Sequence, residues 1–167
     1  MVSIRKAKIE DVEQIKQLLL DNVEFQKDYL LSKLQKEALN KYFSEHKILS
    51  LVEGINVFVA EDDVRDDADK ILNNELEIIG VFAVEENLLF SLYTKKSENF
   101  VNIEIGKEML DYAEIVIQEK GFDEVNALAL EPLKRFFEKN KYKEAEKWIL
   151  EFDGVKFNEF RLTKSLI

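Results

Sequence analysis

The sequence predicts one α/β (α+β) domain whose central sheet is mixed but mostly antiparallel, with helices on both of its faces. Apolar spacing changes along the chain in the order strand, helix, helix, three strands, helix, strand, helix and two strands. The long helix late in this order implies one parallel step in the sheet. No internal repeat and no linker rich in Pro, Gly or Ser interrupts residues 1–167, so we expect a single domain.

The first half of the chain shows helical spacing twice after a short opening strand. Acidic Glu10 and Asp11 stand where a helix should begin, close to the positive end of its dipole. Apolar residues then recur every three or four positions as far as Asn22. A second helical stretch is interrupted near Ser32. The expected elements are a strand over 3–8, a helix over 10–22, helical structure over 24–46 and a strand over 56–60.

The second half contains the remaining strands and two helices. Gly80 lies inside an apolar strand and is a candidate for a bulge. Gly121 suits the C-cap of a long amphipathic helix, and Pro132 opens a short helix at a position that tolerates proline. A turn at Asp153-Gly154 separates the last two strands. The expected elements are strands over 75–84 and 88–94, a loop over 95–102, a helix over 103–120, a strand over 123–130, a helix from 132, and strands over 142–152 and 157–166.

Composition excludes several classes of function. The net charge of −10 repels nucleic-acid phosphate and anionic lipid, so we expect neither a nucleic-acid nor a membrane partner. There is no Cys, and His46 is the single His, which argues against a metal site and a Cys nucleophile. The acidic run over 61–69 lacks the spacing of a calcium loop and is interpreted as solvated. Without an apolar signal core or spanning segment, a cytoplasmic location is expected.

Four segments, in the right order and at compatible spacing, resemble local signatures of the GNAT N-acetyltransferase superfamily. The element order is similar to that of the family over essentially the whole chain. This resemblance implies a GNAT-like fold and an acetyl-CoA-dependent N-acetyltransferase that transfers the acetyl group directly to a primary amine. The segments are Ile4–Ile15 at the opening strand and first helix, Ile78–Phe82 in the central hairpin, Gln118–Val125 after the long helix, and Phe136–Tyr142 in the late aromatic stretch.

The resemblance places the acetyl-CoA pyrophosphate at the start of the long helix, in an Arg/Gln-x-x-Gly-x-Gly/Ala motif. In the matching window Val101 replaces the Arg or Gln, Glu104 replaces the first Gly, and only Gly106 agrees. Backbone N–H groups do not depend on side-chain identity, so the loop either keeps acetyl-CoA or has become an ordinary helix start. The cofactor-binding candidates are Leu92, Tyr93, Val101, Ile103, Glu104, Ile105, Gly106 and Lys107, and no metal is implied.

The family also implies an acid for the CoA thiolate and a base for the acceptor ammonium. The usual acidic Tyr corresponds to Phe137, which has no proton to give. Tyr142 is the nearby candidate acid, with a packing role as the alternative. Glu85 is the candidate base, with a solvated turn residue as the alternative. Backbone near Leu92 or Tyr93 is expected to contact the thioester carbonyl.

Three functional hypotheses stay open. The first is an N-acetyltransferase for a small-molecule amine or a protein amine, and the acidic charge favours a cationic acceptor. The second is a catalytically inactive GNAT-like binding or interaction module, motivated by Val101, Glu104 and Phe137. The third is an oligomerisation protein, such as a homodimer, that would use apolar side chains of the final strands. Those side chains are Trp148, Phe152, Phe157 and Phe160.

Overall fold

A seven-stranded sheet forms the centre of the structure, a computed structural model that describes residues 2–54, 56–62 and 76–167. Its strand order is β1-β2-β3-β4-β5-β7-β6. All neighbouring strands are antiparallel except β4 and β5, which run parallel because the helix between them crosses back over the sheet. The predicted mixed, mostly antiparallel sheet is therefore confirmed.

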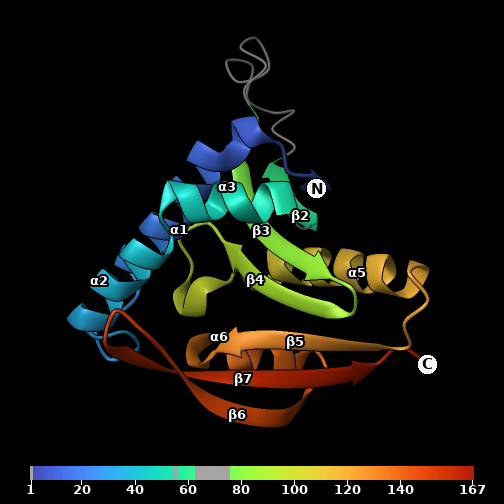
Figure 1. Cartoon of the computed structure of the whole chain (residues 1–167). Coiled ribbons are helices and arrows are strands. Elements are labelled where there is room, and N and C mark those ends of the chain that lie inside the picture. Colours follow the sequence, from blue (N-terminus) through green and yellow to red (C-terminus); the bar gives the residue numbers. More distant parts are fainter. Residues whose placement is uncertain (1, 55, 63–75) are drawn as a thin grey trace.

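Helices cover both faces of this sheet (Figure 1). Phe82 packs against Tyr112 of α5, whereas the neighbouring Val81 lies with Ile15 and Leu19 of α1 on the opposite face. The strands are β1 (Val2–Lys6), β2 (Asn56–Asp62), β3 (Ile78–Glu85), β4 (Leu88–Thr94), β5 (Glu124–Leu130), β6 (Lys143–Phe152) and β7 (Val155–Ser165). The helices are α1 (Val12–Phe25), α2 (Lys33–Tyr42), α3 (Glu45–Gly54), α5 (Ile103–Glu119) and α6 (Glu131–Lys139), with short 3-10 turns at Ile9–Asp11 and Glu98–Phe100.

The helical stretch predicted over 24–46 is in fact the end of one helix followed by two others. Ser32 is the N-cap of α2: its hydroxyl accepts a hydrogen bond from the Gln35 N–H at 3.1 Å, and Gln35 Oε1 accepts one from the Ser32 N–H at 3.0 Å. The third helix, α3, continues to Gly54, beyond the predicted end. The predicted solvated loop over 61–69 is wrong at its start, because Glu61 and Asp62 extend β2 and Glu61 is buried. The rest of that loop lies outside the described residues.

Gly80 allows close packing between the sheet and α5. In the pair of β2 and β3, Ala60 is opposite Gly80 and Glu61 is opposite Ile78, so Ile79 has no partner. The bulge predicted at Gly80 therefore lies one residue away, at Ile79. A Cβ on Gly80 would overlap the Met109 sulfur of α5. The missing side chain therefore lets the long helix approach the middle of the sheet.

The parallel strands β4 and β5 pair at two positions only and then diverge. Leu88 pairs with Asn126 and Leu89 with Ala127, and the remainder of β4 has no partner on β5. Ser91, with φ of 54°, lies at a bulge that shifts the register between β3 and β4. Figure 1 shows the sheet opening into two halves, β1 to β4 on one side and β5, β7 and β6 on the other.

Candidate functional site

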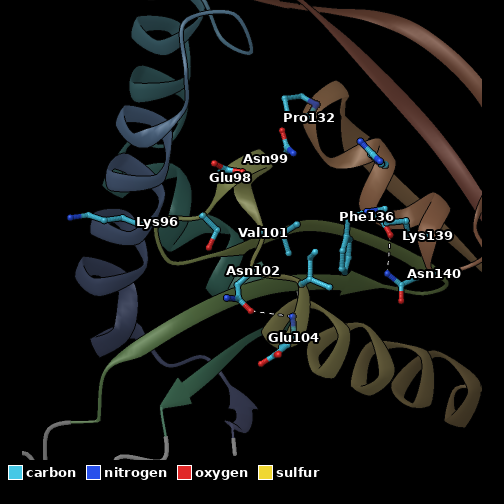
Figure 2. Close-up of a pocket in the computed structure, with 13 residues that line it drawn as sticks. Lys96, Glu98, Asn99, Val101, Asn102, Glu104, Pro132, Phe136, Lys139 and Asn140 are labelled. Carbon is cyan, nitrogen blue, oxygen red and sulfur yellow. Dashed lines mark hydrogen bonds between the residues drawn. The ribbon is translucent and has the colours of Figure 1, made fainter.

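A cavity of about 620 Å³ lies between the start of α5, the loop before it and α6 (Figure 2). The loop begins directly after Thr94, at the diverging end of β4. The cavity therefore lies beside the place where the two halves of the sheet separate. Its lining residues are Lys96, Ser97, Glu98, Asn99, Val101, Asn102, Ile103, Glu104, Pro132, Arg135, Phe136, Lys139 and Asn140.

Among the described residues, three basic side chains line this cavity in a chain whose net charge is −10. They are Lys96, Arg135 and Lys139, and the acidic side chains beside them are Glu98 and Glu104. Within the same described part of the chain, none of the three cations has an ion-pair partner. They are therefore available to an anionic ligand.

Arg135 and Lys139 were not among the residues predicted for the site. Both belong to α6, four positions apart, so they share one face of that helix. This spacing is visible in the sequence, but it indicates a cofactor site only once α6 is known to face the start of α5. The element order alone does not give that arrangement.

Two polar side chains, Asn22 of α1 and Gln26 at the C-cap of that helix, hold the loop that forms one wall of the cavity. The fully buried Asn22 donates through Nδ2 to the carbonyls of Thr94 at 2.6 Å and Phe100 at 3.0 Å. Gln26 donates to the Ser97 carbonyl at 2.8 Å and to Asn22 Oδ1 at 3.0 Å. Because buried amides are costly to leave unpaired, these bonds fix the path of the loop.

Asn102 caps α5 and occupies the backbone groups that were expected to hold the pyrophosphate. Its Oδ1 accepts hydrogen bonds from the N–H groups of Glu104 and Ile105, both at 3.1 Å (Figure 2). The Gly106 N–H donates to the Asn102 carbonyl at 2.8 Å. These three N–H groups are thus satisfied internally, and an anion that takes those of Glu104 and Ile105 must displace the Asn102 side chain.

Gly106 permits close contact between α5, the loop and α6. A Cβ at this position would lie 2.5 Å from Val101 Cγ2 and 3.0 Å from the Phe136 ring. Val101 therefore contributes an apolar wall where the family motif carries a polar side chain. Figure 2 shows the Glu104 carboxylate directed away from Val101 and Phe136, which removes its charge from the apolar side of the cavity.

The structure brings most predicted cofactor residues to this place. Val101, Ile103 and Glu104 line the cavity, and Ile105 and Gly106 follow in the same helical turn. The other predicted residues do not line it. Leu92 and Tyr93 are buried at the end of β4, and Lys107 pairs with Asp111 along α5.

Neither predicted catalytic side chain lines the cavity. Tyr142 is buried, and its hydroxyl donates to Glu114 Oε1 at 2.9 Å; burial and the Glu114 charge raise the pKa of Tyr142 above its usual value. Glu85 is exposed at the β3–β4 hairpin, at the end of β4 remote from the cavity loop. Phe137 is buried against Tyr142. Catalytic roles for Tyr142 and Glu85 stay predictions.

No protein-family model matches the chain, and no curated protein matches its sequence. Among solved structures, a GCN5-related N-acetyltransferase from Rhodopseudomonas palustris superposes with a TM-score of 0.83 at 18% identity, over 98% of this chain and 95% of that one. The chain has the fold of the GNAT N-acetyltransferases. PaiA N-acetyltransferase from Thermoplasma acidophilum, in complex with coenzyme A, matches at TM-score 0.64 and 22% identity over 99% of both chains. YncA from Salmonella typhimurium, with its cofactor acetyl-CoA, matches at TM-score 0.61 and 12% identity over 100% of this chain and 95% of that one.

The described ranges also bear on the other expectations. No helix in them is long and apolar enough to cross a membrane, and no group of three or more His, Cys, Asp or Glu side chains is placed to hold a metal ion. In the final strands Phe157 and Phe160 are buried, while Trp148 and Phe152 are half-buried. These aromatics mainly serve the core, so the homodimer stays a prediction, as do the cytoplasmic location and the absence of a nucleic-acid partner.

Proposed function

We propose that this chain is an acetyl-CoA-dependent N-acetyltransferase that transfers acetyl directly to a primary amine of a small molecule or a protein. The observation that carries the proposal is the cavity at the start of α5 in an acidic chain. Lys96, Arg135 and Lys139 line it, and none of them has an ion-pair partner among the described residues. Coenzyme A is a polyanion, and a local cluster of cations favours such a ligand. The coenzyme A and acetyl-CoA complexes of PaiA and YncA support the same ligand class here.

The cations and the strand edge have separate tasks in this proposal. Arg135 and Lys139 hold phosphate groups, and the first-turn N–H groups of α5 add donors once Asn102 moves aside. The residues of β4 after Leu89 lack a β5 partner, so this edge offers backbone N–H and C=O groups to the amides of the pantetheine arm. The thioester then comes to lie near Leu92 and Tyr93.

Direct transfer depends mainly on holding the amine and the thioester together. The C–N bond forms as the C–S bond breaks, and the departing thiolate must be protonated. No tyrosine is among the described residues that line the cavity, and Phe137 occupies the position of the family acid. The acceptor nitrogen itself is therefore the proton source that we assign to the thiolate.

Isothermal titration of acetyl-CoA into the purified protein tests the proposal. We expect binding in the micromolar range, followed by acetyl transfer when a panel of primary amines is added. If protein that is folded by circular dichroism gives no heat at millimolar acetyl-CoA, the proposed enzymatic function is contradicted.

A catalytically inactive GNAT-like module is the second candidate. Two observations favour it: the Asn102 side chain already accepts from two first-turn N–H groups of α5, and Phe137 cannot act as an acid. Acetyl-CoA binding without turnover over the amine panel would support this candidate over the transferase.

A further inference from the structure

Glu159 is a half-buried carboxylate that has no role so far. It lies in β7, opposite Leu130 of β5 and Trp148 of β6. The Trp148 indole Nε1 donates to Glu159 Oε1 at 2.9 Å. Across the described ranges, no Lys or Arg forms an ion pair with Glu159. A carboxylate that is partly removed from water without a cation favours a ligand that supplies one.

Glu159 lies level with the diverging end of β4, because Leu89 pairs with Ala127 of β5 and Leu130, three residues further along β5, pairs with Glu159. Burial raises the pKa of Tyr42 in α2 and of Tyr93 in β4, and the Glu159 charge raises both further. Burial also raises the pKa of Glu159, against the opposing effect of the Trp148 hydrogen bond. Arg161, two residues along the same face of β7, donates instead to Asn126 at 2.8 Å and Glu146 at 2.6 Å.

A row of ring contacts, here called the aromatic wall, connects this carboxylate with the cofactor cavity. Its first ring, Phe100, directly precedes the cavity residue Val101. Its last ring, Phe152, stacks at 4.5 Å on Phe157, which lies two residues before Glu159 on the same face of β7. Aromatic faces attract ammonium cations. The wall consists of Phe100, Tyr93, Phe43, Tyr42 and Phe152, with successive centroid separations of 5.5, 5.8, 5.4 and 4.9 Å.

We propose that Glu159 receives the ammonium group of the acceptor at the Phe152 end of the aromatic wall, while Trp148 holds the carboxylate in place. The inference rests on the proposed function and deepens it, because it makes the acceptor a primary alkylammonium. The Trp148 bond engages Oε1 and leaves Oε2 for the cation. Tyr93 links the two sites, since the thioester is expected at this end of β4.

In this arrangement the ammonium gives one proton to the Glu159 carboxylate and becomes a neutral amine. The nitrogen lone pair forms the C–N bond with the thioester carbon, and the C–S electron pair leaves on sulfur. The second proton on nitrogen passes to the thiolate, which yields the amide and free coenzyme A. Glu159 then releases its proton to water. A carboxylate with a raised pKa is the better proton acceptor for this step.

The single tryptophan reports directly on the carboxylate. Trp148 is the only Trp in the chain, so ¹⁵N-labelled protein gives one indole N–H resonance. We would titrate wild type, Glu159→Gln and Glu151→Gln with spermidine and butylamine, using butanol as the neutral control. Gln at 159 keeps an oxygen for the Trp148 donor, and Glu151 is an exposed carboxylate on the neighbouring β6. These titrations are carried out without acetyl-CoA.

We expect the amines to shift the indole resonance in wild type and Glu151→Gln, and butanol to shift neither. In Glu159→Gln the amine affinity should fall about tenfold or more, the range for a lost charged hydrogen-bond partner. In turnover, Glu159→Gln should raise the amine KM and remove the acid limb of the pH profile of kcat/KM. Equal amine binding by wild type and Glu159→Gln, or no indole response in wild type, would overturn the inference.

The two proposals fail separately. Glu159→Gln should bind acetyl-CoA as tightly as wild type does. If wild type does not bind acetyl-CoA, the proposed function is wrong, but the response of the indole resonance to amines can still be observed. The fold is checked by the melting temperature. Because the pKa of Glu159 is raised in the folded state, the ionised form destabilises the protein above that pKa. Glu159→Gln should therefore be no less stable than wild type at neutral pH, and its advantage should disappear below the unfolded pKa.

Discussion

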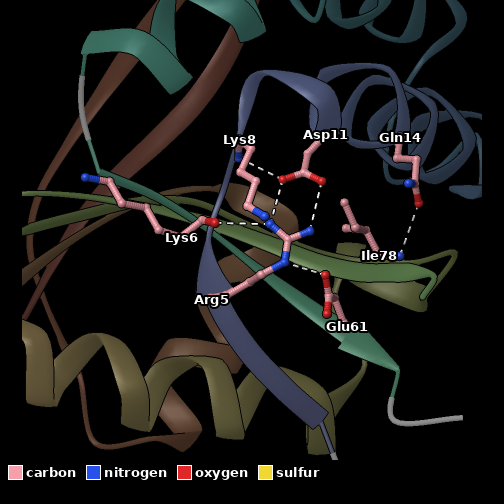
Figure 3. A network of polar contacts seen from close by, with 7 residues as sticks. All are labelled: Arg5, Lys6, Lys8, Asp11, Gln14, Glu61 and Ile78. Atoms are coloured by element: carbon pink, nitrogen blue, oxygen red, sulfur yellow. Dashed lines mark hydrogen bonds and ion pairs between the residues drawn. The ribbon is translucent and has the colours of Figure 1, made fainter. Parts of the chain in front are cut away.

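At the scale of single residues, the ion pair between Arg5 and Asp11 is a charged contact that is largely shielded from water. The Arg5 guanidinium donates to both Asp11 carboxylate oxygens, at 2.7 and 2.9 Å, and also to Glu61 of β2 (Figure 3). The Lys8 N–H donates to Asp11 at 2.7 Å. Burial pushes the pKa of Asp11 up, but the hydrogen bonds from Arg5 and Lys8 outweigh it and hold the pKa below its usual value. The pair therefore joins β1, β2 and the start of α1.

Asp11→Asn should lower the free energy of unfolding by about 2 kcal/mol at neutral pH, because Arg5 loses a charged, bidentate acceptor. Urea denaturation measures this. The control is Asp153→Asn, which breaks the solvent-exposed Lys41–Asp153 pair at 2.9 Å and should cost much less stability than Asp11→Asn. Equal losses in the two variants would show that burial adds nothing to the Asp11 contact.

The pH dependence of this contact has a definite sign. The folded pKa of Asp11 lies below the unfolded pKa, so the stabilisation is fully present above the unfolded pKa and is lost as pH falls through the folded value. The stability difference between wild type and Asp11→Asn should therefore shrink in acid.

At the scale of elements, the start of α5 is a choice between an internal cap and an external ligand. The Asn102 side chain holds two N–H groups that a phosphate would also use. Asn102→Ala should cost about 1 kcal/mol of stability, the usual value of an N-cap, and should strengthen acetyl-CoA binding because the ligand no longer displaces a side chain. Thermal melts and isothermal titration measure the two effects.

Ser32→Ala is the matched control for this prediction. It removes the N-cap of α2, whose hydroxyl accepts from the Gln35 N–H at 3.1 Å. We expect a similar loss of stability without a change in acetyl-CoA affinity, because α2 contributes no residue to the cavity. Weaker acetyl-CoA binding by Asn102→Ala than by Ser32→Ala would mean that Asn102 itself contacts the ligand.

At the scale of the whole molecule, local patterns predicted the elements but not the contacts that the sheet order creates. β4 was predicted at its observed bounds because its apolar spacing and flanking turns lie within a few residues. The helix α3 was missed because the short apolar run after Lys47, directly before a strand, has no period that separates helix from strand.

The candidate site shows the same division. The window from Val101 to Gly106 could be found because it is contiguous. Glu159 could not be found, because its position opposite Leu130 depends on β7 inserting between β5 and β6. The role of Asn22 in holding the cavity loop depends likewise on how α1 packs against a segment far along the chain.

The whole-molecule charge raises a last question, whether an acidic protein binds a polyanion through its local cations or despite its total field. Arg135→Glu and Lys33→Glu each change the net charge from −10 to −12, since one positive charge becomes one negative charge. Arg135 lines the cavity, whereas Lys33 is exposed at the start of α2.

Charges more than about 8 Å apart in solvent are largely screened at physiological salt, so the cations that line the cavity should dominate acetyl-CoA binding. We expect Arg135→Glu to weaken acetyl-CoA binding by roughly tenfold or more and Lys33→Glu to leave it nearly unchanged in isothermal titrations. Equal weakening by both variants would show that the net charge controls affinity and that the cations on α6 have no specific role.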